Sequence, residues 1–156
     1  ERPGSSLPSA LAARISRRRF WDLIGDLSSK SVTVLVTTHY LDEAEHCHRL
    51  AIIHAGKLAA MGTANELKQV FSDRPILEIQ AARPVQAMDA LDRLDTVEKT
   101  SLFGTAVHAV MRSAQTSPAM LAAALAGAGV DVSGIDPVSP SLEDVFLDVV
   151  ERVGAA

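Results

Sequence analysis

The sequence is short of several features that define particular classes of protein. Its 156 residues include one cysteine, Cys47, which excludes an internal disulfide framework and suits a reducing compartment. Aromatic residues make up 4% of the chain, so its core must be built from alanine, valine, leucine and isoleucine. No apolar run approaches the roughly 20 residues that cross a bilayer. The longest, residues 119–129, is rich in alanine and predicts a packed helix.

An excess of positive charge is also missing. The net charge of −4 predicts no nucleic-acid partner, because general nucleic-acid binders gain affinity by neutralising phosphates. A hydrophobic content of 47% is enough for a core, and the length allows one domain or two small ones. The first residues have neither an initiating methionine nor the layout of a signal peptide. We interpret the chain as a piece of a longer protein, and leave the origin of residues 1–14 open.

The first half predicts an α/β arrangement. Residues 1–15 are rich in proline, glycine, serine and alanine and are expected to form a loose arm. A helix is predicted from Ser16, because apolar residues recur at three-and-four spacing after it. Residues 32–38 are β-branched and almost continuously apolar, which is typical of a parallel strand covered on both faces. A short acidic helix is expected over residues 41–48.

A hairpin and a capped helix complete the first domain. Residues 50–54 and 57–61 predict two strands around a turn at Ala55-Gly56. Thr63 and Glu66 have the spacing of a capping box and predict the start of a further helix. Composition and pattern change near residues 72–75. We therefore place the domain boundary there, with a first domain over residues 16–74 and a second over residues 75–156.

The second domain predicts an α+β fold. Its expected elements are strand 76–81, a helix from Pro84, a hairpin of strands 97–103 and 106–111, a helix from Ser117-Pro118 and strand 132–138. This βαββαβ order is typical of the split βαβ, or ferredoxin-like, plan. A last amphipathic helix begins near residues 139–141, with an apolar stripe at helical spacing made of Leu142, Val145, Phe146, Val149, Val150 and Val153.

His39 is the candidate functional residue. It follows the strand expected over residues 32–38, and ligands of open α/β sheets bind at the carboxyl ends of such strands. An imidazole at this position can donate a hydrogen bond to a phosphate oxygen or to a water. The helix expected after it would add free backbone N–H groups. From the residues alone, a surface or hydrogen-bonded structural histidine is the more frequent interpretation of such a position.

Two stretches of the sequence resemble ABC transporter ATPases of the drug-export, ABC-2 type, related to daunorubicin-resistance ATPases. TVLVTTHYLDEAEHCHRLAIIHAGKLAAMGTANELK is similar to the segment after their catalytic core, with a match over residues 17–68. PSLEDVFLDVV, residues 140–150, is similar to the closing motif of their small C-terminal domain. The resemblance implies a C-terminal piece of a P-loop ATPase domain followed by an accessory domain. It also implies that His39 is the switch histidine that contacts the γ-phosphate in the intact protein.

The motifs that would hold the nucleotide are missing from the sequence. It has no G-x-x-x-x-G-K-[ST] phosphate loop, no L-S-G-G-Q signature and no aspartate-glutamate pair ending a metal-binding strand. Gly56-Lys57 is followed by Leu58, and the aspartate of the family's S-G-x-D-P turn falls on Ala13. We predict that this chain alone holds no cofactor and does not hydrolyse ATP. ATP and Mg²⁺ are implied only for the intact parent protein.

The resemblance also implies partners and a location. Membrane-spanning transporter subunits would bind the parent protein at the inner, cytoplasmic face of the cell membrane, and they would set the transported substrate. Exposed strand edges pair with other chains, so we expect a homodimer, with domain swapping as one route to it.

Two alternatives stand beside this interpretation. One is a standalone regulatory or protein-interaction module of ferredoxin-like type without nucleotide chemistry, because fold alone does not specify function. The other is a zinc site built from His39, His46, Cys47 and His48. His46 and His48 are two residues apart on an expected helix and would point in different directions, so we predict no metal site.

Overall fold

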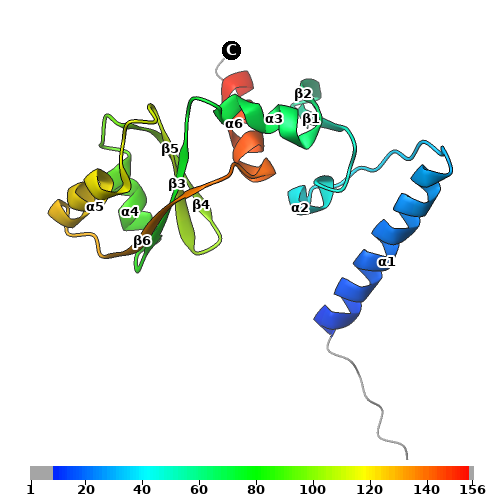
Figure 1. The fold of residues 1–156 in the computed structure, drawn as a ribbon, viewed down its shortest axis with the longest axis horizontal. Coiled ribbons are helices and arrows are strands. Elements are labelled where there is room, and N and C mark those ends of the chain that lie inside the picture. Colours follow the sequence, from blue (N-terminus) through cyan, green and yellow to red (C-terminus); the bar gives the residue numbers. More distant parts are fainter. Residues whose placement is uncertain (1–8, 155–156) are drawn as a thin grey trace, which may run out of the picture. The chain divides into compact units, whose positions relative to one another are not determined.

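The computed structural model describes residues 9–154, with side chains from residue 17 onward. It is a mixed α/β structure with two antiparallel sheets (Figure 1). The elements follow in the order α1 (Ser9–Ser29), α2 (Leu41–Ala44), β1 (Leu50–His54), β2 (Lys57–Gly62), α3 (Ala64–Lys68), the 3-10 helix η1 (Gln69–Phe71), β3 (Ile76–Ala81), α4 (Pro84–Leu91), β4 (Val97–Phe103), β5 (Ala106–Met111), α5 (Pro118–Gly127), β6 (Val132–Val138) and α6 (Leu142–Gly154).

The chain divides into two compact units, Glu1–His46 and Cys47–Ala156. In the first unit, α1 begins at Ser9 and not at Ser16. The loose arm predicted for residues 1–15 is therefore wrong for residues 9–15, and residues 1–8 lie outside the described part. The reason is local. The helix-breaking proline and glycine residues of the N-terminal stretch all lie at or before Pro8, and residues 10–14 are strong helix formers. Among the described helices, none is both long and apolar enough to cross a bilayer.

Residues 32–38 do not form the predicted parallel strand. They have no regular secondary structure, and the side chain of Leu35 is 94% exposed. A strand exists only where a neighbouring segment pairs with its backbone groups, and no described segment of the first unit does so. The acidic helix predicted over residues 41–48 is also shorter than expected, because α2 ends at Ala44.

The second unit begins with the predicted hairpin. β1 and β2 pair antiparallel around Ala55-Gly56, and both turn residues have positive φ, 49° and 74°. The capping box that opens α3 is confirmed. The backbone N–H of Glu66 donates to Thr63 Oγ1 at 3.2 Å, and the N–H of Thr63 donates to Glu66 Oε2 at 2.8 Å.

The four-stranded sheet has the strand order β4-β5-β3-β6, and all its neighbours are antiparallel. Strands 76–81, 97–103, 106–111 and 132–138 are confirmed at the predicted bounds. α4 and α5 cover one face and enclose the main core. Its buried members are Leu77, Ile79, Ala87, Leu91, Val97, Val107, Ala109, Met111, Leu121, Leu125 and Val130.

α6 lies against the other face of this sheet and also against the β1–β2 hairpin and α3. Its Val145 packs with Phe71 of η1, Ile76 of β3 and Val110 of β5 in a second buried cluster. The boundary predicted near residue 75 therefore falls inside the second compact unit. The physical reason is that one apolar helix face covers segments from both sides of that position.

Candidate functional site

His39 is exposed and lies between the irregular residues 32–38 and α2. Its ring lies beside the ring of Tyr40, with centroids 4.1 Å apart. The predicted setting at the end of a parallel strand is wrong for this chain, because residues 32–38 form no strand. α2 has four residues and cannot offer the helix N-terminus that the prediction needed.

A small polar cluster holds the backbone on both sides of His39. Thr38 Oγ1 donates to Glu43 Oε2 at 3.0 Å and accepts from the backbone N–H of Tyr40 at 3.0 Å. Arg17 Nε of α1 lies 3.2 Å from Glu43 Oε1, and its guanidinium stands 4.9 Å from the centre of the Tyr40 ring. These contacts leave the imidazole facing solvent, where a group from another molecule can reach it.

This cluster does not fit a complete nucleotide site. Binding the β- and γ-phosphates takes a cradle of backbone N–H groups, a lysine and oxygen ligands for Mg²⁺. Around His39 the structure offers one imidazole, while Glu43 is already bonded to both Arg17 and Thr38. The described residues around His39 therefore do not supply the groups that hold the phosphates of a nucleotide.

The other candidate ligands of a metal do not converge. The ring of His46 lies 5.2 Å from that of Trp21, both in the first unit. Within residues 9–154, no three histidine, cysteine, aspartate or glutamate side chains are placed to share a metal ion. Burial raises the pKa of the Cys47 thiol, which makes it a weaker metal ligand at neutral pH.

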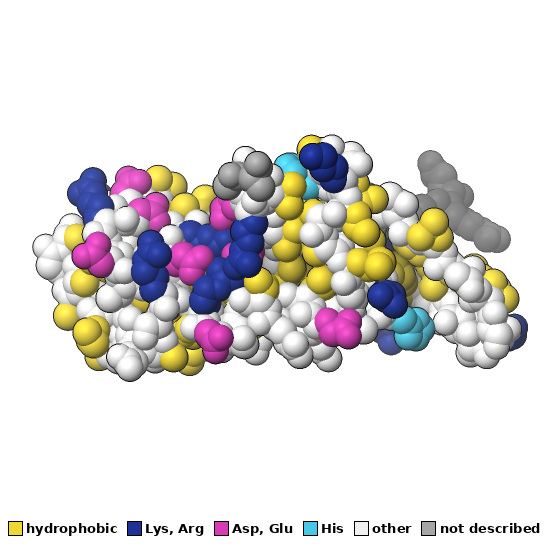
Figure 2. All heavy atoms as spheres, turned by 90° about the horizontal axis from the view of Figure 1, so that it is seen from above, with side chains coloured by type: hydrophobic (Ala, Val, Ile, Leu, Met, Phe, Trp, Pro, Cys, Tyr) yellow, Lys and Arg dark blue, Asp and Glu magenta, His cyan; other side chains and the backbone are white. Residues whose placement is uncertain are grey.

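Asp148 on α6 is the centre of an ionic cluster that the sequence did not reveal. Its side chain is 1% exposed. It accepts hydrogen bonds from Arg74 Nη1 at 3.0 Å, Arg74 Nη2 at 3.2 Å and Lys99 Nζ at 2.8 Å. It also forms an ion pair with Arg152, whose Nε lies 3.0 Å from Asp148 Oδ2. Burial acts to raise the pKa of Asp148, but the bonds from Arg74 and Lys99 outweigh it and lower that pKa. Figure 2 shows basic and acidic side chains gathered in one mixed patch on the second unit.

The partners of Asp148 reach further carboxylates. Arg74 Nη1 also donates to Glu98 Oε1 at 2.7 Å, and Lys99 Nζ donates to Glu151 Oε2 at 2.8 Å. Arg74 lies between η1 and β3, while Lys99 is on β4. The cluster therefore ties α6 to the segment before the sheet and to an edge strand of the sheet.

His108 on β5 is a second buried polar centre that sequence reasoning missed. It is 3% exposed, with Nδ1 2.9 Å from Asp144 Oδ1 and Nε2 3.4 Å from Glu78 Oε2. The Phe103 ring stacks on the imidazole with centroids 4.2 Å apart. One signal was available, since His108 and Glu78 occupy opposed positions on paired strands. Asp144 comes from α6, which no local pattern places there.

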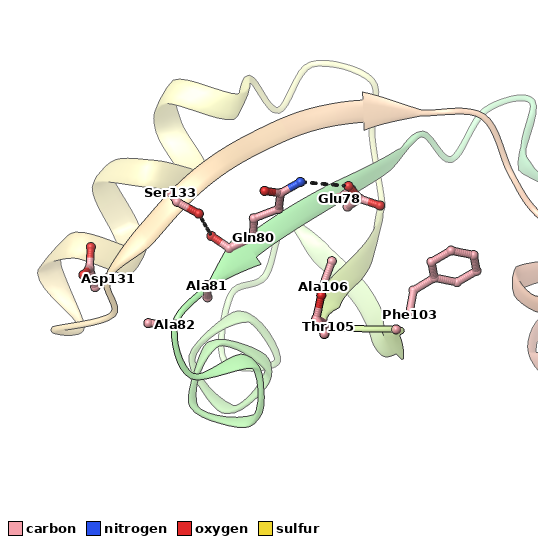
Figure 3. Close-up of a pocket in the computed structure, with 10 residues that line it drawn as sticks. Glu78, Gln80, Ala81, Ala82, Phe103, Thr105, Ala106, Asp131 and Ser133 are labelled. Atoms are coloured by element: carbon pink, nitrogen blue, oxygen red, sulfur yellow. Dashed lines mark hydrogen bonds between the residues drawn. The ribbon is translucent and has the colours of Figure 1, made fainter. Parts of the chain in front are cut away.

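A shallow hollow of about 620 Å³ lies near this centre, at one end of the sheet. Figure 3 shows Phe103 and Glu78 toward one end and Asp131 and Ser133 toward the other. Gln80 Nε2 donates to Glu78 Oε1 at 3.4 Å, and Ser133 Oγ donates to the Gln80 carbonyl at 3.1 Å. Glu78, Gln80 and Ser133 of the lining are thus bonded to one another.

Comparison with known proteins identifies the family. Residues 62–150, more than half of the chain, match the family described as ATP-binding protein DrrA1-3-like, C-terminal domain. The chain belongs to this family. The DrrA1-3-like match includes the stretch from β3 to the middle of α6, and it does not include His39.

Similar proteins carry names of exporters and resistance proteins. The chain is 31% identical over 138 residues to the Nod factor export ATP-binding protein I of Paraburkholderia xenovorans, covering 88% of this chain and 43% of that protein. It is 31% identical over 133 residues to the daunorubicin resistance ATP-binding protein DrrA3 of Streptomyces coeruleorubidus, covering 84% and 42%. A probable multidrug ABC transporter ATP-binding protein, YbhF of Escherichia coli, is 46% identical over 61 residues, which are 39% of this chain and 11% of that protein.

The predicted family is therefore confirmed. The chain spans less than half the length of each of these relatives.

Proposed function

We propose that this chain is the C-terminal portion of the ATP-binding subunit of an ABC-type exporter of the multidrug, ABC-2 kind. The observation that carries the proposal is the match of residues 62–150 to a C-terminal domain of DrrA1-3-like ATP-binding proteins. The names of two relatives, for Nod factor export and daunorubicin resistance, support an export role. The parent subunit would bind membrane-spanning subunits from the cytoplasmic side.

The two domains have different proposed roles. Residues 16–74 would be the last piece of a P-loop nucleotide-binding domain, and residues 75–156 a ferredoxin-like accessory domain that regulates or stabilises the ATPase dimer. The strand order β4-β5-β3-β6 with two helices on one face supports the ferredoxin-like plan. In the intact protein, His39 would be the residue of this chain that contacts the γ-phosphate. Its exposure, and the bonds that hold its neighbours Thr38 and Tyr40, support that role.

The test uses a chimera in which this chain replaces the matching part of the Paraburkholderia xenovorans relative. We expect the isolated chain to show only background ATP turnover, because it has no phosphate cradle. The chimera should hydrolyse ATP, and His39→Ala should lower its turnover by about 10²-fold or more, the usual loss when a group acting on the reacting phosphate is removed.

His48→Ala is the matched control, because His48 is also an exposed histidine. It should leave the turnover of the chimera unchanged. Equal turnover in the chimera with and without His39→Ala would refute the assigned role. If the isolated chain hydrolysed ATP and His39→Ala abolished that activity, the proposal that hydrolysis requires the missing phosphate-binding motifs would be refuted. A chimera that folds but neither binds nor hydrolyses ATP would favour the standalone module.

For the isolated chain, we also propose a homodimer that forms through residues 32–38. Leu35 is 94% exposed, Val32 46% and Val34 37%, so an apolar segment of strand composition faces water. An exposed apolar segment of this kind favours association with another chain, which would cover it. Light scattering after size exclusion should give twice the monomer mass, and Leu35→Glu should return the chain to a monomer. A monomer at high concentration before substitution would refute this association.

A further inference from the structure

We propose that His108 makes the docking of α6 onto the four-stranded sheet sensitive to pH. The inference concerns the accessory domain alone and goes beyond the export role proposed above. It starts from the position of His108 on β5, on the sheet face opposite α4 and α5. The imidazole is 3% exposed and is held between groups from three different elements, Asp144 of α6, Glu78 of β3 and Phe103 of β4.

The two ring nitrogens of His108 both face carboxylate oxygens. Nδ1 lies 2.9 Å from Asp144 and Nε2 lies 3.4 Å from Glu78. A neutral imidazole has one N–H, so it can donate to only one of them and must turn a lone pair toward the other. An imidazolium donates from both nitrogens. The geometry therefore favours the charged form of His108.

Asp144 connects this charge to the start of α6. Its Oδ2 accepts from the backbone N–H of Ser141 at 2.8 Å and from Ser141 Oγ at 2.7 Å, while its own N–H donates to Ser141 Oγ at 3.1 Å. One carboxylate oxygen of Asp144 thus caps the helix, and the other meets His108. Asp144 is 4% exposed. When His108 is neutral, Asp144 keeps at most a weaker, uncharged hydrogen bond from the ring, so this buried carboxylate loses the charge that stabilises it and the first turn of α6 is held less firmly.

The charged groups around His108 also favour loosening of the first turn of α6 when the imidazole loses its proton. α6 contributes Asp144 and β3 contributes Glu78, while β6 places Asp136 opposite Glu78. On β4, the groups nearest in register are Ser101 and the stacked Phe103, which are uncharged. Further along α6, Asp148 is already paired with Arg74 and Lys99, so the loss of the His108 proton leaves Asp144 and Glu78 as the two carboxylates that lose their cation and repel one another.

The pKa directions give the window in which docking is strongest. Burial acts to lower the pKa of His108, but Asp144 and Glu78 outweigh burial and raise it above its ordinary value of 6.5. A raised pKa in the folded state stabilises docking fully below the unfolded pKa, and this contribution is lost as pH rises through the folded pKa.

Asp144 sets the acidic side of the same window. Burial acts to raise its pKa, but the bonds with His108 and Ser141 outweigh burial and lower it below its ordinary value of 3.8. That contribution is present above the unfolded pKa and is lost as pH falls through the folded value. Both contributions are therefore complete between the ordinary pKa values of 3.8 for Asp144 and 6.5 for His108, where the first turn of α6 should be held most firmly. The turn should loosen as pH rises through the raised pKa of His108.

Hydrogen exchange of the full chain between pH 5 and 9, with NMR titration of the histidine rings, tests this inference. After correction for the pH dependence of intrinsic exchange, amides in the first turn of α6 should lose protection by about tenfold or more as His108 deprotonates, the usual effect of losing a hydrogen bond to a charged group. Amides of α5 should not change, because α5 packs on the other face.

His108→Gln should remove the alkaline loss of protection, because glutamine has no charge to lose. His48→Gln, at an exposed histidine, is the matched control and should keep that loss. A His108 ring that titrates below the ordinary value, or α6 signals that do not follow the ring, would overturn the inference in the unaltered chain, even if the His108 variant fails to fold. The inference would also be overturned if a folded His108→Gln variant still lost amide protection in the first turn of α6 at alkaline pH.

Discussion

Replacing Asp148 with asparagine is expected to lower the free energy of unfolding by about 3 kcal/mol. Asparagine keeps the shape of the side chain but removes a charge that is 1% exposed and meets Arg74, Lys99 and Arg152. Removing one member of a buried ionic cluster leaves the others without a counter-charge, and this is costly. The loss should lie at the low end of such effects, because Arg74 and Lys99 are 15% and 20% exposed and keep Glu98 and Glu151 as second partners.

Urea unfolding at neutral pH measures this loss, and Glu151→Gln is the matched control. Glu151 shares Lys99 with Asp148 but is 59% exposed, so its removal should cost less than about 1 kcal/mol. The pKa of Asp148 is lowered in the fold, so its contribution is present above the ordinary aspartate pKa and lost as pH falls through the folded value. The difference between the unaltered chain and Asp148→Asn should shrink accordingly in acid. Equal losses for the two variants would show that the buried carboxylate has no special role.

The second unit could be predicted closely because its signals are local. The hairpin of β4 and β5 turns at Gly104, which has a φ of 60° that glycine adopts without strain. Thr63 and Ser117 cap the helices that they were predicted to start. Alternation, turn residues and caps act over a few positions, so the sequence alone specifies the bounds of the sheet strands.

The first unit could not be predicted in the same way, because its strand signal depends on a partner. Residues 32–38 have the composition of a buried strand, yet composition states only what a segment can bury. The backbone of a strand also needs hydrogen-bond partners on a neighbour. For the same reason, the motif around His39 was enough to indicate the family but not to predict the surroundings of the imidazole.

The buried charges on α6 escaped prediction for a third reason. Asp144 and Asp148 are four residues apart, so they lie on one helix face beside Val145. In the sequence they are ordinary acidic residues of an amphipathic helix. Their cations, His108, Arg74 and Lys99, lie far away along the chain and meet them only when α6 docks. Spacing within one element carries no information about such partners.

Replacing Val145 with aspartate should have a larger effect than any other single change considered for this chain, a loss of about 4 kcal/mol or more in the free energy of unfolding. Val145 is 0% exposed and packs against Phe71, Ile76 and Val110. The substitution removes its apolar contacts and places a carboxylate among hydrophobic side chains. Leu147→Asp is the matched control on the same helix.

Leu147 is 39% exposed, so its aspartate can be solvated and should change stability by less than about 1 kcal/mol. Thermal unfolding followed by circular dichroism would compare the two, and limited proteolysis would show whether α6 is released. Because both variants add the same charge to the same helix, they differ only in the face that carries it. A similar stability for Val145→Asp and Leu147→Asp would mean that α6 does not dock through Val145, and the ionic cluster at Asp148 and the pH response at His108 would then lose their structural basis.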